Sequence, residues 1–151
     1  MPKYEVFLKD DVRDLMDLAR DWVELGWRHT PEDPFDFYTR LGSFYDWWSG
    51  DTQFFDDFDQ RRRINLSAAQ YAAIWDAVIP GLQRLTNVMI GEPRPIVSGD
   101  LAVMTVQFIT SFVTAEGQEG HVHTLSSLVW RRSGNSWRII REHGSGIKHH
   151  P

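Results

Sequence analysis

The feature that most constrains the fold is the stretch Leu101–Thr114, which is rich in β-branched and aromatic residues. In a strand, alternate side chains point to opposite faces of the sheet. One alternate set is Leu101, Val103, Thr105, Gln107, Ile109, Ser111 and Val113, and the other is Ala102, Met104, Val106, Phe108, Thr110, Phe112 and Thr114. Neither set has the polar character of a face in water. We therefore expect both faces of this sheet to be covered, one by helices and the other by a second subunit.

The first half of the sequence has helical periodicity instead. Apolar residues recur at spacings of three and four from Asp10 to about Thr30, which predicts one long amphipathic helix. A shorter helix is expected from about Pro34 to Tyr45. A third should begin at Ser67, a suitable N-cap, and should end or bend at Pro80-Gly81. Between them, the stretch Gln53–Phe58 is a candidate for a short strand.

The remaining segments are predicted strands joined by short turns. Residues 86–97 contain many β-formers but also glycine and proline, which is typical of an edge strand or a bulge. His121–Arg132 and Trp137–Ser145 follow glycine-containing turns, and strands joined in this way pair antiparallel. Helices followed by strands predict an α+β fold. With 151 residues, the chain has the size of one domain, and we expect a single domain over residues 1–151 with an ordered core from about residue 9 to residue 147.

Composition excludes several classes of function. The chain has no cysteine, which excludes disulfides, thiolate metal sites and a cysteine nucleophile, and fits a cytoplasmic location. The net charge is −5, and the only short basic run is Arg61–Arg63, so we expect no nucleic-acid partner. No apolar stretch approaches the ~18 residues of a membrane-spanning helix, so no membrane partner is expected.

The order of three helices and then a strongly curved sheet resembles the SnoaL-like branch of the nuclear transport factor 2-like superfamily. The resemblance is carried by the long first helix, the segment Phe54–Phe58 (FFDDF), the hairpin Arg131–Trp137, and the ending Trp137-x-Ile139 with Glu142-His143-x-Ser145. Ketosteroid isomerases, scytalone dehydratase and limonene epoxide hydrolase have this fold, as does the association domain of calcium/calmodulin-dependent protein kinase II. The resemblance covers nearly the whole chain. It implies three N-terminal helices packed on a curved mixed or antiparallel sheet that forms a cone with a central pocket, and a homodimer formed through the sheet.

Asp56 and Asp57 are the first candidates for chemistry. Because adjacent strand residues point to opposite faces, only one of the two carboxylates can face the pocket. A carboxylate among phenylalanine rings has a raised pKa, which suits a general base. The resemblance to ketosteroid isomerases places their base at Asp57, which we take as the catalytic candidate. The alternative is that both acids lie on the surface.

His143 is the second catalytic candidate. A histidine beside Asp57 would form a pair of base and orienting group, and the alternative is a structural histidine near the cone mouth or at the dimer surface. Strand alternation does not decide which residues face inward, because a single bulge reverses it. The resemblance places a catalytic tyrosine of ketosteroid isomerases at Trp22 and an acid/base aspartate of polyketide cyclases at Ser145. Both differences argue against those two reactions.

The expected partner is a small hydrophobic molecule that contains a carbonyl group or an aromatic ring. Its predicted binding residues are Trp22, Tyr38, Phe55, Trp75, Phe108 and Ser145. The resemblance implies isomerisation, cyclisation or dehydration by proton transfer without a cofactor. The alternative is a non-catalytic ligand-binding or dimeric assembly module. His121-x-His123 has a spacing that can bind metal, but no third ligand is close in sequence, so we expect no metal.

Overall fold

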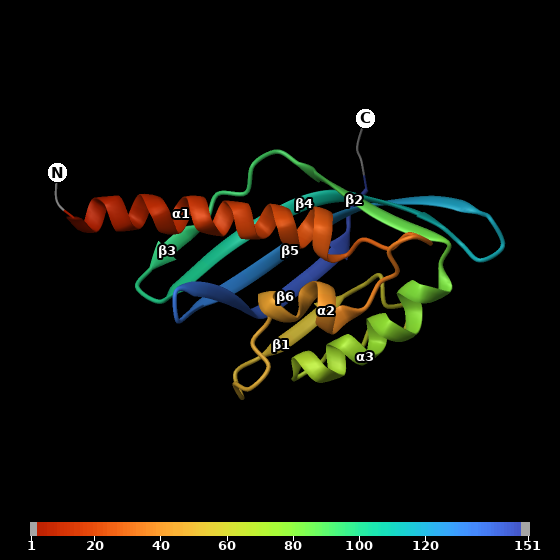
Figure 1. Cartoon of the computed structure of the whole chain (residues 1–151), viewed down its shortest axis with the longest axis horizontal. Helices are drawn as coiled ribbons and strands as arrows, with labels where there is room; N and C mark the ends of the chain where they lie inside the picture. Colours follow the sequence, from red (N-terminus) through yellow and green to blue (C-terminus); the bar gives the residue numbers. More distant parts are fainter. Residues whose placement is uncertain (1–2, 149–151) are drawn as a thin grey trace.

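Within residues 3–148, which the computed structural model describes, a curved six-stranded sheet carries three α-helices on one face (Figure 1). Side chains are described from residue 11 onward. The helices are α1 (Lys3–Asp21), α2 (Phe37–Leu41) and α3 (Ala68–Val78). The strands are β1 (Gln53–Asp56), β2 (Arg84–Ile90), β3 (Ile96–Ser98), β4 (Leu101–Val113), β5 (Glu119–Ser133) and β6 (Ser136–Gly146). This architecture confirms the predicted α+β fold of helices on a mixed sheet.

The first helix differs from the predicted one at both ends. It begins at Lys3 rather than Asp10, and after Asp21 it continues as one π-helical turn, Trp22–Gly26. Glycine ends this turn because a Cβ at position 26 would overlap the side chain of Leu41. The π turn itself therefore packs closely against α2, and it places Trp22 over the sheet.

The two shorter helices begin at side-chain caps. Asp36 accepts a hydrogen bond from the backbone of Thr39 at the start of α2. Ser67 accepts one from the backbone of Gln70, over 3.1 Å, at the start of α3. The cap predicted at Ser67 is thus confirmed, because its hydroxyl satisfies a helix N–H group that otherwise has no partner.

The strand order in the sheet is β1-β6-β5-β4-β2, and β3 pairs with the first three residues of β4. Strands β4, β5 and β6 form the antiparallel hairpins that the sequence predicts. The short strand β1 joins the edge in parallel with the last strand, so that Phe55 lies opposite His143 and Asp56 opposite Gly144. This pairing brings two segments about 90 residues apart to one end of the sheet, where the cavity described below lies.

The two faces of the sheet have different environments. Along β4 the even-numbered residues from Ala102 to Thr110 are buried under the helices. The odd-numbered set faces away, and Leu101 and Val103 are 45% and 46% exposed. The helices of the chain therefore cover one face, and the opposite face remains open in the single chain.

A bulge in β6 reverses the alternation of that strand. The register with β5 shifts between Val129 and Trp130, and Ile139 and Ile140 are both buried. Beyond the bulge Glu142 points inward, and the exposed His143 is on the outer face. The sequence of β6 alone therefore does not predict which of its residues face the core.

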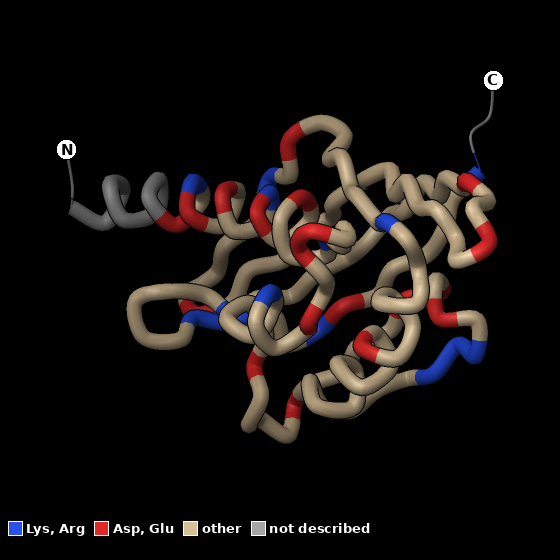
Figure 2. Tube along the Cα trace, turned by 45° about the vertical axis from the view of Figure 1, so that its right-hand side comes forward, with Lys and Arg blue, Asp and Glu red and all other residues tan. Residues whose placement is uncertain are grey.

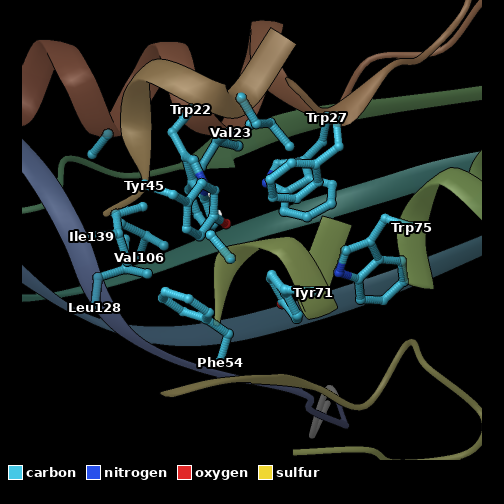
Figure 3. Close-up of a cluster of buried hydrophobic side chains, with 14 of the residues drawn as sticks. Trp22, Val23, Trp27, Tyr45, Phe54, Tyr71, Trp75, Val106, Leu128 and Ile139 are labelled. Carbon is cyan, nitrogen blue, oxygen red and sulfur yellow. Dashed lines mark hydrogen bonds between the residues drawn. The ribbon is translucent and has the colours of Figure 1, made fainter. Parts of the chain in front are cut away.

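The core between helices and sheet is built largely from aromatic rings (Figure 3). Trp27 packs edge-on against Trp22 and Trp75, with ring centroids 6.1 and 5.6 Å away. Tyr71 packs against Trp27, Trp75 and Phe54. Large rings supply much of the buried area of a core, and here they also form the walls of a cavity.

Candidate functional site

A narrow cavity of about 40 Å³ lies between the helices and the covered face of the sheet. Its apolar wall includes Trp22, Trp27, Phe58, Trp75 and Phe108. Its polar groups are Asp56, Glu142, Tyr71, Asn87, Thr110 and Thr124. A cavity of this size holds a few water molecules. Two carboxyl groups inside an aromatic wall are unusual, because charged groups are seldom buried without a partner.

Glu142 lies at the inner end of this cavity and is held by two tyrosines. Tyr45 and Tyr71 each approach one of its carboxyl oxygens, Oε1 and Oε2, with O–O distances of 2.5 Å. Trp22 donates its indole N–H to the Tyr45 hydroxyl at 3.0 Å. Because Tyr45 already accepts this bond, it donates its own proton to Oε1 of Glu142. Side chains from α3, the π turn and the segment after α2 thus hold the carboxyl group in one position.

Burial raises the pKa of Glu142 to about 8. The tyrosine hydrogen bonds lower this pKa, and the charge of Asp56 raises it further. Glu142 is therefore mainly protonated at neutral pH. Tyr45 donates its hydroxyl proton to Oε1 of Glu142, and Tyr71 donates its own to Oε2. The side chain of Tyr71 also lines the cavity, so this bond lies beside the space for a ligand.

Asp56 is the second carboxyl group of the cavity. Its Oδ1 accepts a hydrogen bond from the backbone N–H of Phe58 at 2.8 Å, and its Oδ2 lies over Gly144. A Cβ at position 144 would overlap this oxygen, so glycine makes room for the carboxylate. Burial raises the pKa of Asp56 to about 6, and the charges of Asp57 and Asp59 contribute. Asp56 is therefore mainly ionised at neutral pH.

The cavity thus holds an ionised and a protonated carboxyl group under the same conditions. The charge of Asp56 also raises the pKa of Tyr71, after burial and the charges of Glu142 and Tyr45. The pKa values of Asp56 and Glu142 are thus about 6 and about 8. Two neighbouring groups with separated pKa values are the usual arrangement of a general base and a general acid.

Three of the predicted ligand-binding residues, Trp22, Trp75 and Phe108, line the cavity. Tyr38 does not: its side chain is 72% exposed and packs against Trp47 near α2. Ser145 is half-buried and is absent from the cavity wall.

The structure does not bring Asp57 and His143 together in the cavity. The Asp57 carboxylate accepts the backbone N–H of Gly146 at 3.0 Å and borders a separate outer groove. His143 is exposed and packs edge-on against Phe55, with centroids 5.1 Å apart. The inward positions of β1 belong instead to Phe54 and Asp56. The strand alternation assumed for Asp57 is therefore off by one residue, and Phe55 lies outside the cavity for the same reason.

Sequence reasoning missed Glu142, Tyr45 and Tyr71 as polar groups of the site. Glu142 stood in the C-terminal motif, but its inward direction depends on the bulge at Ile140. The two tyrosines occur at periodic apolar positions of predicted helices, where their rings account for the pattern. Nothing in a single sequence indicates that the hydroxyl groups of these tyrosines, in addition to their rings, belong to the site.

His121 and His123 lie on β5 opposite Ser111 and Ile109 of β4, and neither lines the cavity. Their rings approach Ser111 and Gln107, each at 3.0 Å. In the part of the chain that the structure describes, no three His, Asp or Glu side chains converge as metal ligands. No helix among the described residues is long and apolar enough to cross a membrane.

In a comparison with protein families, residues 44–148 match the model of the SnoaL-like domain. The chain belongs to the SnoaL-like family. The match spans β1 to β6 and all the polar groups of the cavity, and the first two helices with Trp22 and Trp27 of the cavity wall lie before it. A comparison with curated protein sequences finds no match.

Solved structures show the same fold over nearly the whole chain. A nuclear transport factor 2-like superfamily protein from Salmonella enterica serovar Typhimurium has a TM-score of 0.76 at 19% identity, over 95% of this chain and 96% of that one. A hexachlorocyclohexane dehydrochlorinase has a TM-score of 0.66 at 14% identity, over 97% and 95%. The association domain of calcium/calmodulin-dependent protein kinase II from C. elegans has a TM-score of 0.59 at 15% identity, over 93% and 96%. At such identities the likeness shows the fold, and one fold carries many functions.

Proposed function

We propose that this SnoaL-like protein catalyses proton transfer on a small hydrophobic carbonyl compound, with Asp56 as the general base. The observation that carries the proposal is the pair of carboxyl groups in one aromatic cavity, with pKa values of about 6 for Asp56 and about 8 for Glu142. Between these two values the site holds a base and an acid at once, as acid–base catalysis at neutral pH requires.

The proposed step uses three side chains. The Asp56 carboxylate removes a proton from the carbon next to the carbonyl group, and the electron pair of that C–H bond forms an enolate. In this step protonated Glu142 donates to the oxygen of Tyr71, which reverses the direction of the bond in the structure, and the freed hydroxyl proton of Tyr71 bonds to the enolate oxygen. Return of the proton from Asp56 to another carbon gives an isomer, and loss of a leaving group from the enolate gives an elimination product. The step needs no cofactor.

The test is hydrogen exchange at the carbon next to the carbonyl group of 2-pentanone, followed in D₂O by NMR. We expect exchange above the buffer rate, and Asp56→Asn should lower the enzymatic rate roughly 10²–10⁴-fold, the usual contribution of a general base. Asp57→Asn is the matched control, because it makes the same chemical change one residue further along and outside the cavity. Exchange that survives Asp56→Asn, or that is lost in Asp57→Asn, contradicts the assignment.

We also propose that the open face of the sheet binds a second copy of the chain, as the sequence predicts. Six large apolar residues are exposed on this face: Val88, Ile90, Ile96, Leu101, Val103 and Ile109. A contiguous apolar surface of this kind is usual at an interface and unusual on a monomer. An interface alone also fits the alternative function, a non-catalytic assembly or ligand-binding module. Such a module, however, has no use for a base and an acid held in one cavity.

A further inference from the structure

A second hollow lies on the other side of the cavity wall. It is an open groove of about 670 Å³ at the end of the sheet, bordered by the loop after β1, the end of α3 and the strands β4 and β5. Its apolar walls are Val78, Leu82, Phe112 and Val122, and its rim includes Gln60 and Arg61. The loop after β1 carries both acidic and basic residues (Figure 2). We call this hollow the outer groove.

Phe58 borders both the cavity and the outer groove, and no other described residue lines both. Its half-buried ring lies between Trp75, 6.2 Å away, and Phe112, 5.6 Å away between centroids. Phe112 in turn rests on Gly120, where a Cβ would overlap its ring. One aromatic side chain thus separates the two spaces, and it packs against a second ring at the border.

The backbone that carries Phe58 is firmly held. Its N–H bonds to the Asp56 carboxylate at 2.8 Å. The next residue, Asp59, is buried and accepts bonds from the backbone N–H groups of Arg61 and Arg63 and from the Arg63 guanidinium. The loop is therefore braced on both sides of Phe58, and the easiest movement left is rotation of the ring about its own side-chain bonds.

We infer that the Phe58 ring is a gate and that the ligand spans the cavity and the outer groove. A cavity of about 40 Å³ is too small for an organic molecule, so a wall must move when one enters. Rotation of Phe58 joins the cavity to the groove and requires no change in the braced loop. The ligand that fits the joined space is elongated and mostly apolar. Its carbonyl head lies beside Asp56 and Tyr71, and its hydrocarbon tail lies against Leu82 and Val122. The chemistry of the head rests on the function proposed above.

The gate is tested by stopped-flow binding of 2-nonanone, followed by tryptophan emission, because Trp22, Trp27 and Trp75 line the cavity. In the native protein we expect the observed rate to level off at high ketone concentration, where opening of the gate limits entry. Phe58→Ala should abolish this plateau and raise the limiting rate by about tenfold or more. Phe55→Ala is the matched control, since it removes a ring three residues earlier, on β1, that packs against His143 and does not line the cavity. If Phe58→Ala folds poorly, Phe112→Ala removes the other ring of the gate and should have the same effect.

The spanning ligand is tested by the affinity of 2-alkanones of increasing length. Each added methylene group should improve binding about fourfold until the groove is filled, the factor that corresponds to burial of one CH₂. Val122→Asp places a charge in the groove. It should weaken the binding of 2-nonanone about tenfold or more and have little effect on the binding of 2-pentanone.

If the observed binding rate still levels off as in the native protein in both Phe58→Ala and Phe112→Ala, the proposal of a gate is wrong. Affinity that is independent of chain length overturns the spanning ligand, and absence of ketone binding in every variant overturns both. Gated, length-dependent binding without hydrogen exchange at 2-pentanone would instead refute only the proposed catalysis.

Discussion

Replacing Glu142 by glutamine should stabilise the protein at alkaline pH. The pKa of this group is about 8 in the folded protein against the ordinary 4.5, because its burial penalises the charged form. A raised pKa means that the contribution to stability is fully present below the unfolded value and is lost as the pH rises through the folded value. The difference of about 3.5 pH units corresponds to about 5 kcal/mol of unfolding free energy lost between acidic and alkaline pH. Glutamine cannot ionise, and it can still accept from Tyr45 and donate to Tyr71.

The assay is urea unfolding of both proteins at about pH 5 and about pH 9. We expect near-equal stability at the lower pH and a stabilisation of Glu142→Gln by several kcal/mol at the higher one. Glu119→Gln, at an exposed position of β5, is the control for removal of a surface carboxylate. If Glu142→Gln destabilises the protein equally at both pH values, Glu142 is a charged, fully solvated or ion-paired group, and the reasoning about its protonation is refuted.

Three further substitutions have expected outcomes. Ser126 is fully buried on β5 and its hydroxyl has no hydrogen-bond partner among the described residues, so Ser126→Ala should raise the unfolding free energy by about 1 kcal/mol. In contrast, Thr52→Val should lower it by about 1 kcal/mol, because that hydroxyl donates to the Leu66 carbonyl at 2.7 Å; equal effects in urea unfolding would contradict this distinction. Val103→Lys, on the open sheet face, should convert a dimer of about twice 17.6 kDa into a monomer in sedimentation equilibrium. A monomeric native protein at micromolar concentration would remove the proposed interface.

Local signals in the sequence were sufficient for the scaffold. The cap at Ser67 and the long β-forming run after Leu101 are properties of neighbouring residues, and both appear in the structure close to their expected places. The order of helices and strands followed from the same signals. The π turn after Asp21 was not predictable, because it depends on the contact of Gly26 with a side chain from another helix.

The site depended on contacts between distant residues. The pairing of β1 with β6 determines that Asp56 rather than Asp57 faces the cavity, and the bulge at Ile140 reverses the alternation of β6; neither can be seen in the local sequence pattern. As a result, the inward carboxyl groups are Asp56 and Glu142, each one position before a residue that the sequence favoured. An error of one residue moves a side chain to the other face of a sheet. The sequence could therefore predict the type of site but not the residues that form it.

Direct titration of the carboxyl groups tests the central claim, that one cavity holds an ionised aspartate and a protonated glutamate at neutral pH. The measurement is ¹³C NMR of protein labelled at the side-chain carboxyl carbons of aspartate and glutamate, recorded from acidic to alkaline pH. We expect one aspartate signal to titrate near pH 6 and to vanish in Asp56→Asn, and one glutamate signal to titrate near pH 8 and to vanish in Glu142→Gln. If both signals titrate near pH 4, as carboxyl groups in water do, the cavity has no such acid–base pair.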